Sequence, residues 1–557
     1  MSKFRGNPWA VLLVVSLGFF MTLLDLTIVN IAVPDMITEL HASLDDILWV
    51  INAYALVLAV LVITAGRLGD LIGPRIMFAG GVAVFTLASA ACGAAPSPGW
   101  LIGFRAVQGL GAAMLMPQTL TIITNTFPAD RRGVAFGVWG AVAGVATIAG
   151  PTLGGLLVTA FDWRWIFYVN LPFGVIALVL TFVIIPDMRP GRRHRIDVPG
   201  VLLASAGLLA ICYGLVEGQK YNWGTITSFI SIPLVLGAGV VLLLAFLLLQ
   251  RMTQDKEPLV PFALFRDRNY AVVNWVSGTL AVGMMGIFLP FTIYLQSVLG
   301  FTALRAGLTL APASLMSMFL APVAGRLTDK IGGKYILMSG LTLFAVGMGW
   351  AAAVATTTSA WYVFLAPLIV AGAGMGCIFA PMVTVAMRNI DPRMAGAASG
   401  VLNTVRQVGL VIGTAAVGAL LQNRLVSTMT SQATTRSAAL PAQLRGPFVA
   451  GIKHSASNGI QVGAGQNGGA AKLPPGLPAR VMAEIARIGH DVFTFGFVSA
   501  MRSTFLLTVI LLLVGALSCF LLQNRQPAGP ALPDLVPGER AGAAPAQPGP
   551  EPAPHQA

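Results

Sequence analysis

Fourteen apolar segments follow one another along this chain of 557 residues, and no other feature limits its possible folds so strongly. A helix needs about 20 apolar residues to cross a hydrocarbon core of about 30 Å. Hydrophobic residues make up 56% of the chain and charged residues 10%, and the mean hydropathy is +0.80, which leaves too little polar surface for a water-soluble fold. The sequence therefore predicts an all-α polytopic membrane protein with 14 transmembrane helices. The predicted spans are 10–33, 47–66, 77–95, 100–126, 134–160, 165–186, 198–216, 228–249, 270–296, 306–325, 335–355, 361–386, 397–422 and 503–523.

The basic residues predict which side of the membrane each loop faces. The net charge is +13, but the lysines and arginines lie in alternate short loops, so we expect no nucleic-acid partner. The intervening short loops carry only Arg164, Lys220 and Arg305. Because basic loops stay in the cytoplasm, we expect a multi-pass protein of the cytoplasmic (inner) membrane with both termini cytoplasmic. The basic set comprises Lys3, Arg5, Arg67, Arg75, Arg131, Arg132, Arg189, Arg192, Arg193, Arg195, Arg251, Lys256, Arg266, Arg268, Arg326, Lys330, Lys334, Arg388 and Arg393.

Signatures of cofactor and metal chemistry are missing from the sequence. The four cysteines lie in apolar stretches without CxxC or Cys/His spacing, so we expect neither a disulfide framework nor a metal site. The chain has no G-x-x-x-x-G-K-[ST] loop and no Ser/His/Asp or Cys/His arrangement. We therefore expect no cofactor and no enzymatic activity.

An internal repeat relates the two halves of the chain. The sequence GRLGDLIG at 66–73 recurs as GRLTDKIG at 325–332. The repeat predicts two six-helix halves of the same orientation, with two extra helices at 198–249 between them. Parallel repeats of this kind are typical of secondary transporters, which bind substrate between the halves. Six further glycines, Gly109, Gly111, Gly133, Gly137, Gly150 and Gly155, are matched at one offset by Gly372, Gly374, Gly396, Gly400, Gly413 and Gly418.

These features divide the chain into six parts. They are an N-terminal six-helix bundle at 1–190, two extra central spans with flanking loops at 191–262, helices 9 to 13 at 263–423, a long extracytoplasmic loop at 424–500, the last span at 501–525 and a disordered cytoplasmic tail at 526–557. Within the loop, an amphipathic helix is predicted near Pro478–His490.

Several motifs lie in a fixed order along the first half. They are LDLTIVNIAVP at 24–34, GRLGDLIGPR at 66–75, RAVQGLG at 105–111, GPTLGG at 150–155 and WRWIF at 163–167. In these motifs the chain closely resembles the major facilitator superfamily, specifically its fourteen-helix drug:proton antiporter branch.

The resemblance implies an exporter driven by a proton gradient, with small-molecule substrates, protons and the lipid bilayer as its partners and a monomeric state. It implies a gating loop at Gly66, Asp70, Gly73, Arg75, Asp329 and Lys330. It also implies an antiporter motif at Gly150, Pro151, Gly154 and Gly155, where close helix packing is an equally good explanation.

Ionisable residues inside the spans locate the predicted chemistry, because a charge in the bilayer is costly. Asp25, Arg105 and Arg406 lie within spans, and Glu217 lies at the outer end of one. With a rise of about 1.5 Å per residue, Asp25 and Arg105 are expected at similar depth in the outer half of the membrane. Neither arginine is repeated in the other half, which favours function over scaffold. The predicted proton-coupling and substrate cavity comprises Asp25, Arg105, Arg406, Glu217, Asn30 and Gln108.

Asp25 is the predicted proton carrier. Desolvation disfavours its charged form and a nearby arginine favours it, so movement that changes either effect would bind or release a proton. A fixed pair that only orders the first helix is the alternative. The leading interpretation is a proton-coupled antiporter that exports small hydrophobic or cationic compounds. An uptake symporter, a lipid or cell-wall-precursor exporter and an assembly role for the 424–500 loop remain alternatives.

Overall fold

The computed structural model describes residues 6–42, 44–128, 131–187, 197–218, 221, 223–254, 258–391, 394–457 and 479–523. Thirteen helices in this part of the chain are long and apolar enough to cross a membrane. The one predicted span that is not among these thirteen, 134–160, falls on α6, a helix of 29 residues. The all-α polytopic architecture predicted from the sequence is therefore confirmed.

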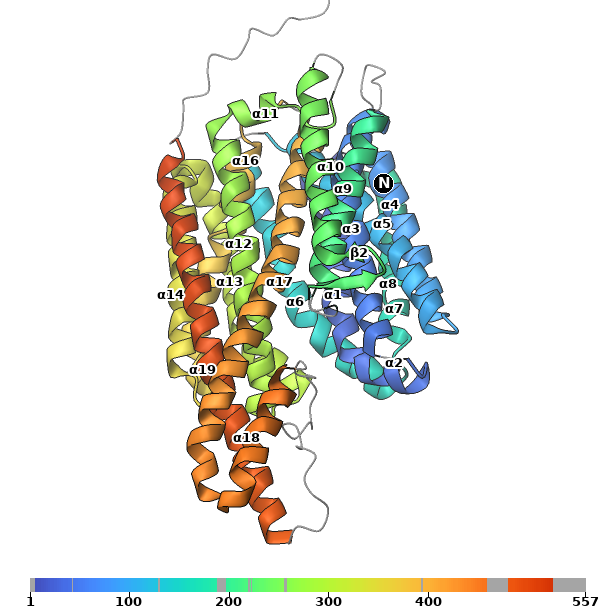
Figure 1. Cartoon of the computed structure of the whole chain (residues 1–557). Coiled ribbons are helices and arrows are strands. Elements are labelled where there is room, and N and C mark those ends of the chain that lie inside the picture. Colours follow the sequence, from blue (N-terminus) through green and yellow to red (C-terminus); the bar gives the residue numbers. More distant parts are fainter. Residues whose placement is uncertain are drawn as a thin grey trace, which may run out of the picture.

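The helices form two halves side by side with an inserted pair between them (Figure 1). The first half contains α1 (Pro8–Ile28), α3 (Leu44–Ile72), α4 (Pro74–Gly93), α5 (Pro98–Thr126), α6 (Arg132–Ala160) and α8 (Asn170–Ile184). The inserted pair is α9 (Val198–Glu217) and α10 (Ile232–Met252). The second half contains α12 (Arg268–Ile293), α13 (Ala303–Ile331), α14 (Lys334–Val354), α15 (Leu365–Gly376), α16 (Phe379–Met387), α17 (Ala395–Arg436) and α19 (Ala479–Ser518).

Short elements connect these helices. They are η2 (Val29–Ala32), α2 (Val33–Glu39), α7 (Trp165–Tyr168), the antiparallel pair β1 (Thr225–Thr227) and β2 (Ile230–Ser231), α11 (Ala263–Arg266), η4 (Tyr294–Val298), η5 (Trp361–Phe364), η7 (Ser437–Ala439), α18 (Ala442–Ser457) and η8 (Cys519–Leu521).

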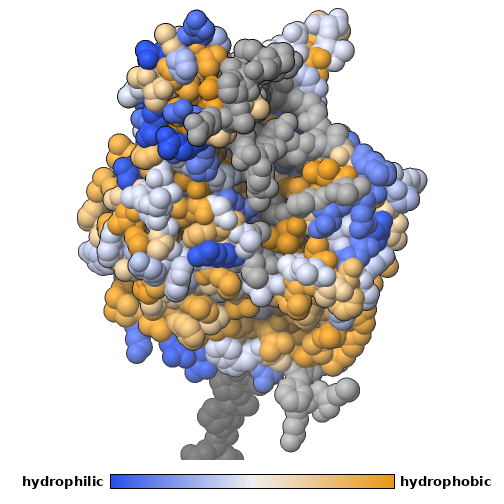
Figure 2. Space-filling model, turned by 90° about the horizontal axis from the view of Figure 1, so that it is seen from below, coloured by the Kyte–Doolittle hydropathy of each residue, from blue (hydrophilic) through white to orange (hydrophobic). Residues whose placement is uncertain are grey.

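The halves meet along α6 with α13 and along α3 with α17, and α9 packs on both α3 and α17. The start of α1 and the end of α19 lie toward the same end of the bundle, which we call the α11 end (Figure 1). The opposite end, where α18 projects, is the α18 end. Viewed from the α18 end, apolar side chains form a wide band around the rim (Figure 2). This band is the surface expected to face lipid.

Two predicted spans are interrupted. The span predicted at 10–33 ends as α1 at Ile28 and continues through η2 into α2, and the span predicted at 361–386 is divided between η5, α15 and α16. Proline explains both breaks, because its ring removes an amide donor and clashes with the carbonyl four residues earlier. Pro34 acts in this way just after η2, and Pro381 acts at the junction of α15 and α16.

The segment 424–500, predicted as an extracytoplasmic loop with an amphipathic helix near Pro478–His490, is helical over most of its described residues. α17 continues to Arg436, α18 follows, and α19 already begins at Ala479, so only 458–478 lie outside the description. The small-residue composition concealed a helical stripe, Leu421, Leu425, Met429 and Ala433, whose members are buried. The stripe lies on the part of α17 that packs against α19, where Thr428 donates a hydrogen bond of 2.9 Å to the Gly496 carbonyl. The two long helices thus support each other beyond the predicted membrane spans.

Candidate functional site

Asp25 and Arg105 meet in the first half, which their similar predicted depths allow. The Arg105 Nη1 atom lies 2.5 Å from Asp25 Oδ2, joining α5 to α1. Gln108, one turn after Arg105, donates from Nε2 to Asp25 Oδ1 over 2.9 Å and accepts from Arg105 Nη1 over 2.8 Å. The spacing of three residues places Arg105 and Gln108 on one face of α5. Both carboxylate oxygens of Asp25 therefore have a donor.

Three residues that the sequence analysis did not select complete the surroundings of Arg105. Its Nε donates to the Val50 carbonyl over 3.0 Å. Its guanidinium lies 4.4 Å from the ring centre of Tyr54 and 5.9 Å from that of Phe167. Cation–π contacts of this kind are worth about 2 kcal/mol when water is excluded. Tyr54 stands in the sequence among other polar and aromatic span residues, so no pattern distinguished it beforehand.

This network is closed to solvent. Asp25 and Gln108 are fully buried and Arg105 is 1% exposed. A buried charge pair stays ionised when each charge has its hydrogen-bonding partners, and removal of either charge leaves the other uncompensated. Chemically, the site brings a carboxylate and a guanidinium together away from solvent, so each group depends on the other as its partner.

The other predicted cavity residues lie elsewhere. Glu217 is buried at the end of α9, one of the two inserted helices. Arg406 lies within α17, in the second half. The side chains of Asn30 and Pro151 lie outside the described residues.

The predicted gating loop forms two equivalent contacts between the halves. Asp70, near the end of α3, accepts hydrogen bonds of 2.8 Å from the amides of Gly396 and Ala397, which begin α17. Asp329, near the end of α13, accepts from the amides of Gly133 and Val134, which begin α6, over 2.9 and 3.1 Å. Each half thus supplies a carboxylate to a helix N-terminus of the other, where unsatisfied amides and the helix dipole favour negative charge. We call this pair of contacts the double latch.

Glycines allow the helices of the double latch to approach closely. A methyl group added at Gly66 would overlap the Gly396 carbonyl, and one at Gly325 would overlap the Gly133 carbonyl. Gly73 and Gly332 end α3 and α13 with φ angles of 106° and 90°, which side chains disfavour. The repeated glycines therefore have equivalent structural roles in the two halves.

The remaining predicted gating residues, Arg75 and Lys330, lie near the ends of helices. Arg75 donates to the Phe182 carbonyl over 2.6 Å, which satisfies the end of α8 within its own half. Lys330 is exposed at the end of α13.

The antiporter motif packs against the end of α1. A methyl group at Gly150 would overlap Thr27, and one at Gly154 would press on Ile28. Gly155 has open space around it. The motif therefore contacts α1 only two or three residues beyond Asp25.

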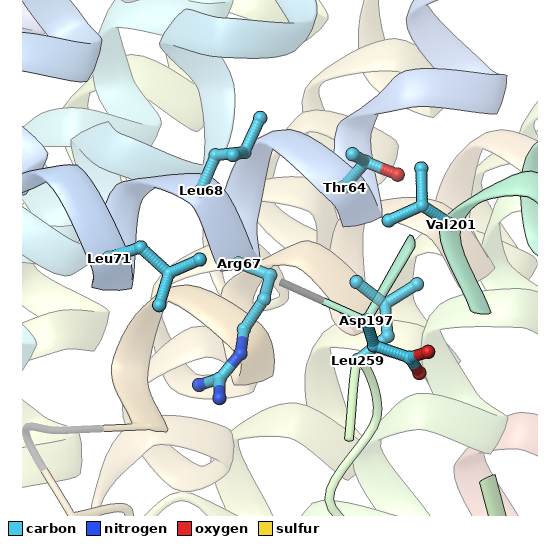
Figure 3. A pocket seen from close by; sticks show the side chains of 7 residues that line it. All are labelled: Thr64, Arg67, Leu68, Leu71, Asp197, Val201 and Leu259. Atoms are coloured by element: carbon cyan, nitrogen blue, oxygen red, sulfur yellow. The ribbon is translucent and has the colours of Figure 1, made fainter. Parts of the chain in front are cut away.

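The inserted helices lie beside the double latch, where the described residues enclose a small pocket. Figure 3 shows a small pocket where α3 meets the start of α9, lined by Thr64, Arg67, Leu68, Leu71, Asp197, Val201 and Leu259. Its volume is about 10 Å³, which suits a single water molecule. Asp197 caps α9 at the Gly200 amide over 2.9 Å and accepts from Gln250 of α10, which ties the inserted pair together.

The fold and the inter-half contacts define a multi-pass membrane transporter built from two repeated halves. The family model "Major Facilitator Superfamily" matches residues 15–414, and the chain belongs to this superfamily. It is 39% identical over 464 residues to an uncharacterized MFS-type transporter of Mycobacterium tuberculosis (82% of this chain, 79% of the relative). It is 36% identical to the tetracenomycin C resistance and export protein of Streptomyces glaucescens (76% and 78%) and 35% identical to a puromycin resistance protein of Streptomyces alboniger (79% and 87%).

Solved structures support the fold independently. The human organic anion transporter MFSD10 superposes with a TM-score of 0.56 at 12% identity, covering 91% of this chain and 99% of that one. The proton:xylose symporter XylE superposes with a TM-score of 0.53 at 14% identity, covering 76% and 90%. At these identities the similarity concerns the fold alone.

Proposed function

We propose that this protein is a proton-coupled antiporter that exports small hydrophobic compounds by alternating access and that it catalyses no chemical reaction. Relatives named for tetracenomycin C export, puromycin resistance and multidrug resistance support export of drugs or metabolites. The observation that carries the proton coupling is the buried Asp25–Arg105 pair. Among the described ion pairs, it is the one in which both side chains are almost completely buried. It adjoins the antiporter motif through α1.

The orientation follows from the basic loops. They support an orientation in which the α11 end, both termini and the double latch face the cytoplasm and the α18 end faces the outside of the cytoplasmic membrane. Because the latch closes the halves at the α11 end, the structure corresponds to a state closed toward the cytoplasm. A monomer holds both halves, and the proton gradient is the proposed energy source without a cofactor.

Movement of α1 against α5 would couple the proton to the substrate. Separation of Asp25 from Arg105 would remove the arginine as the partner of the carboxylate, and a proton would take its place. Since Arg105 neutralises Asp25 here, the geometry supports attraction of cationic substrates less than the sequence alone did.

The test is dye transport in everted membrane vesicles, with and without a proton gradient. The dyes are neutral N-phenyl-1-naphthylamine and cationic ethidium, and the proteins are the intact chain, Asp25→Asn and the matched control Asp35→Asn. We expect gradient-dependent dye uptake into everted vesicles for the intact chain and the control but not for Asp25→Asn. Transport in the opposite direction would favour an uptake symporter, and gradient-independent movement would overturn proton coupling.

A further inference from the structure

Arg406 is a charged residue in the middle of a span. It has no role in the proposed proton coupling by Asp25 and Arg105. It lies eleven residues after the start of α17, which is about 16 Å along the helix axis. A hydrocarbon core of about 30 Å places it near the midplane. Charges at this depth are rare and as a rule face the interior of a bundle.

The face of α17 that carries Arg406 points toward the first half. Ser399 lies seven residues earlier, on the same helical face. Its hydroxyl donates to the Pro117 carbonyl of α5 over 3.0 Å and lies 3.4 Å from the Thr121 hydroxyl. The side chain of Arg406 therefore projects between the halves, one step farther toward the α18 end.

The opposing face of α5 becomes exposed at the same level. Thr121 and Pro117 are buried against α17, and Met114, Leu110 and Val107 continue this face toward the α18 end at helical spacing. Met114 is half-buried, Leu110 is 37% exposed and Val107 is 46% exposed. This side of α5 thus changes from buried against α17 to an exposed apolar face at about the level of Arg406.

Among the described residues, Arg406 has no counter-charge. Within the described part of the chain, it makes no hydrogen bond, ion pair or ring contact, and its Nε atom is buried without an acceptor. This contrasts with Arg105, whose Nε and Nη1 atoms donate to three acceptors. A half-buried guanidinium whose Nε lacks an acceptor favours the entry of an anion, because a carboxylate or similar group accepts its hydrogen bonds and cancels its charge.

We infer that Arg406 binds the anionic group of an exported compound, and that the preferred substrates are hydrophobic molecules bearing a carboxylate, sulfonate or phenolate. The apolar side chains of α5 would contact the rest of such a molecule. This inference rests on the proposed export function, since it assigns the substrate class of the same inter-half space.

The test measures equilibrium binding to the purified full-length protein in detergent without any gradient. Three probes share one apolar scaffold and differ in charge: anthracene-9-carboxylate, anthracene-9-methanol and anthracene-9-methylammonium. We expect the intact protein to bind the carboxylate most tightly. Arg406→Gln should lower carboxylate affinity by about tenfold or more while affinity for the alcohol stays within about twofold. Arg406→Lys should retain part of the preference, and Arg424→Gln, at an exposed position of the same helix, should change nothing.

Three outcomes would overturn the inference. The intact protein could bind the three probes with equal affinity. The Arg406→Gln variant could keep the preference for the carboxylate, or it could lose as much affinity for the alcohol as for the carboxylate. Retained alcohol binding shows that the variant is folded, and the charge preference of the intact protein needs no variant. Charge-selective binding without gradient-driven transport would instead reject the proposed function and leave this inference standing.

Discussion

Asp25, Arg105 and Gln108 form a closed set of hydrogen bonds in which every charge is matched. Such a set is stable only while it is complete, because a single missing partner leaves a buried charge or acceptor unsatisfied. Proton coupling needs this property, since a small displacement of one helix changes the protonation that is favoured. The same property makes the set sensitive to substitution.

Single substitutions in the pair should therefore be more harmful than the double substitution. We expect Asp25→Asn and Arg105→Gln each to lower the free energy of unfolding by about 3–5 kcal/mol, because each leaves an uncompensated partner. The double variant should lose clearly less than the sum. Unfolding of the purified protein in detergent, followed by intrinsic fluorescence, measures all four members of this cycle, and simple additivity would show that the charges are not coupled.

The sequence was informative about which charges matter and less so about their surroundings. Asp25 and Arg105 were identified because charges within apolar spans are rare, and their depths could be estimated from helix rise alone. Val50 contributes a backbone carbonyl, and Tyr54 and Phe167 contribute ring faces. Many residues of these types occur in the spans, so only the three-dimensional packing distinguishes these three.

At the scale of helices, the internal repeat has a direct structural meaning. Asp70 and Asp329 hold equivalent positions in the two halves and cap equivalent helices across the boundary. The repeat was visible in the sequence, but the reciprocal partners were not, because they lie 195 or more residues away. The sequence predicts a helix near Pro478–His490, and α19 covers 479–490. It does not predict the helices at 424–457, because the many small residues there conceal the four-residue spacing of the buried apolar side chains.

Loss of either latch carboxylate should open the α11 end. We expect Asp70→Asn and Asp329→Asn each to increase the open population several-fold, because a capping interaction contributes about 0.5–2 kcal/mol, and the double variant to increase it further. Alkylation of a cysteine placed at buried Ser399 reports the opening. Asp197→Asn is the matched control, because Asp197 caps α9 without connecting the halves. Equal alkylation rates in all variants would contradict the assignment of the latch.

Two glycines of the antiporter motif, Gly150 and Gly155, should differ sharply in their tolerance of a methyl group. Gly150→Ala forces Thr27 and the end of α1 to move, at a cost of about 1–3 kcal/mol and with loss of transport. Gly155→Ala meets no neighbour and should transport normally. The comparison is made in vesicles with matched protein amounts. If the two variants behaved alike, packing against α1 would not explain the motif.

At the scale of the whole molecule, the two halves touch tightly at one end and separate toward the other. The double latch closes the α11 end. One face of α5 is buried at Thr121 and becomes exposed farther along, at Val107. The Asp25–Arg105 pair lies within one half, and Arg406 lies on the other. A rocking motion of the halves would therefore change the surroundings of the proton site and of the proposed anion site together.

The most direct test of this account compares two kinds of transport by Asp25→Asn in proteoliposomes. Gradient-driven accumulation requires a proton to bind and leave, whereas exchange of labelled for unlabelled substrate at equal pH requires only the rocking motion. The account predicts that the variant loses accumulation and keeps exchange, because asparagine imitates a permanently protonated carboxyl group. Undiminished accumulation by the variant, or loss of exchange by a correctly folded variant, would contradict it.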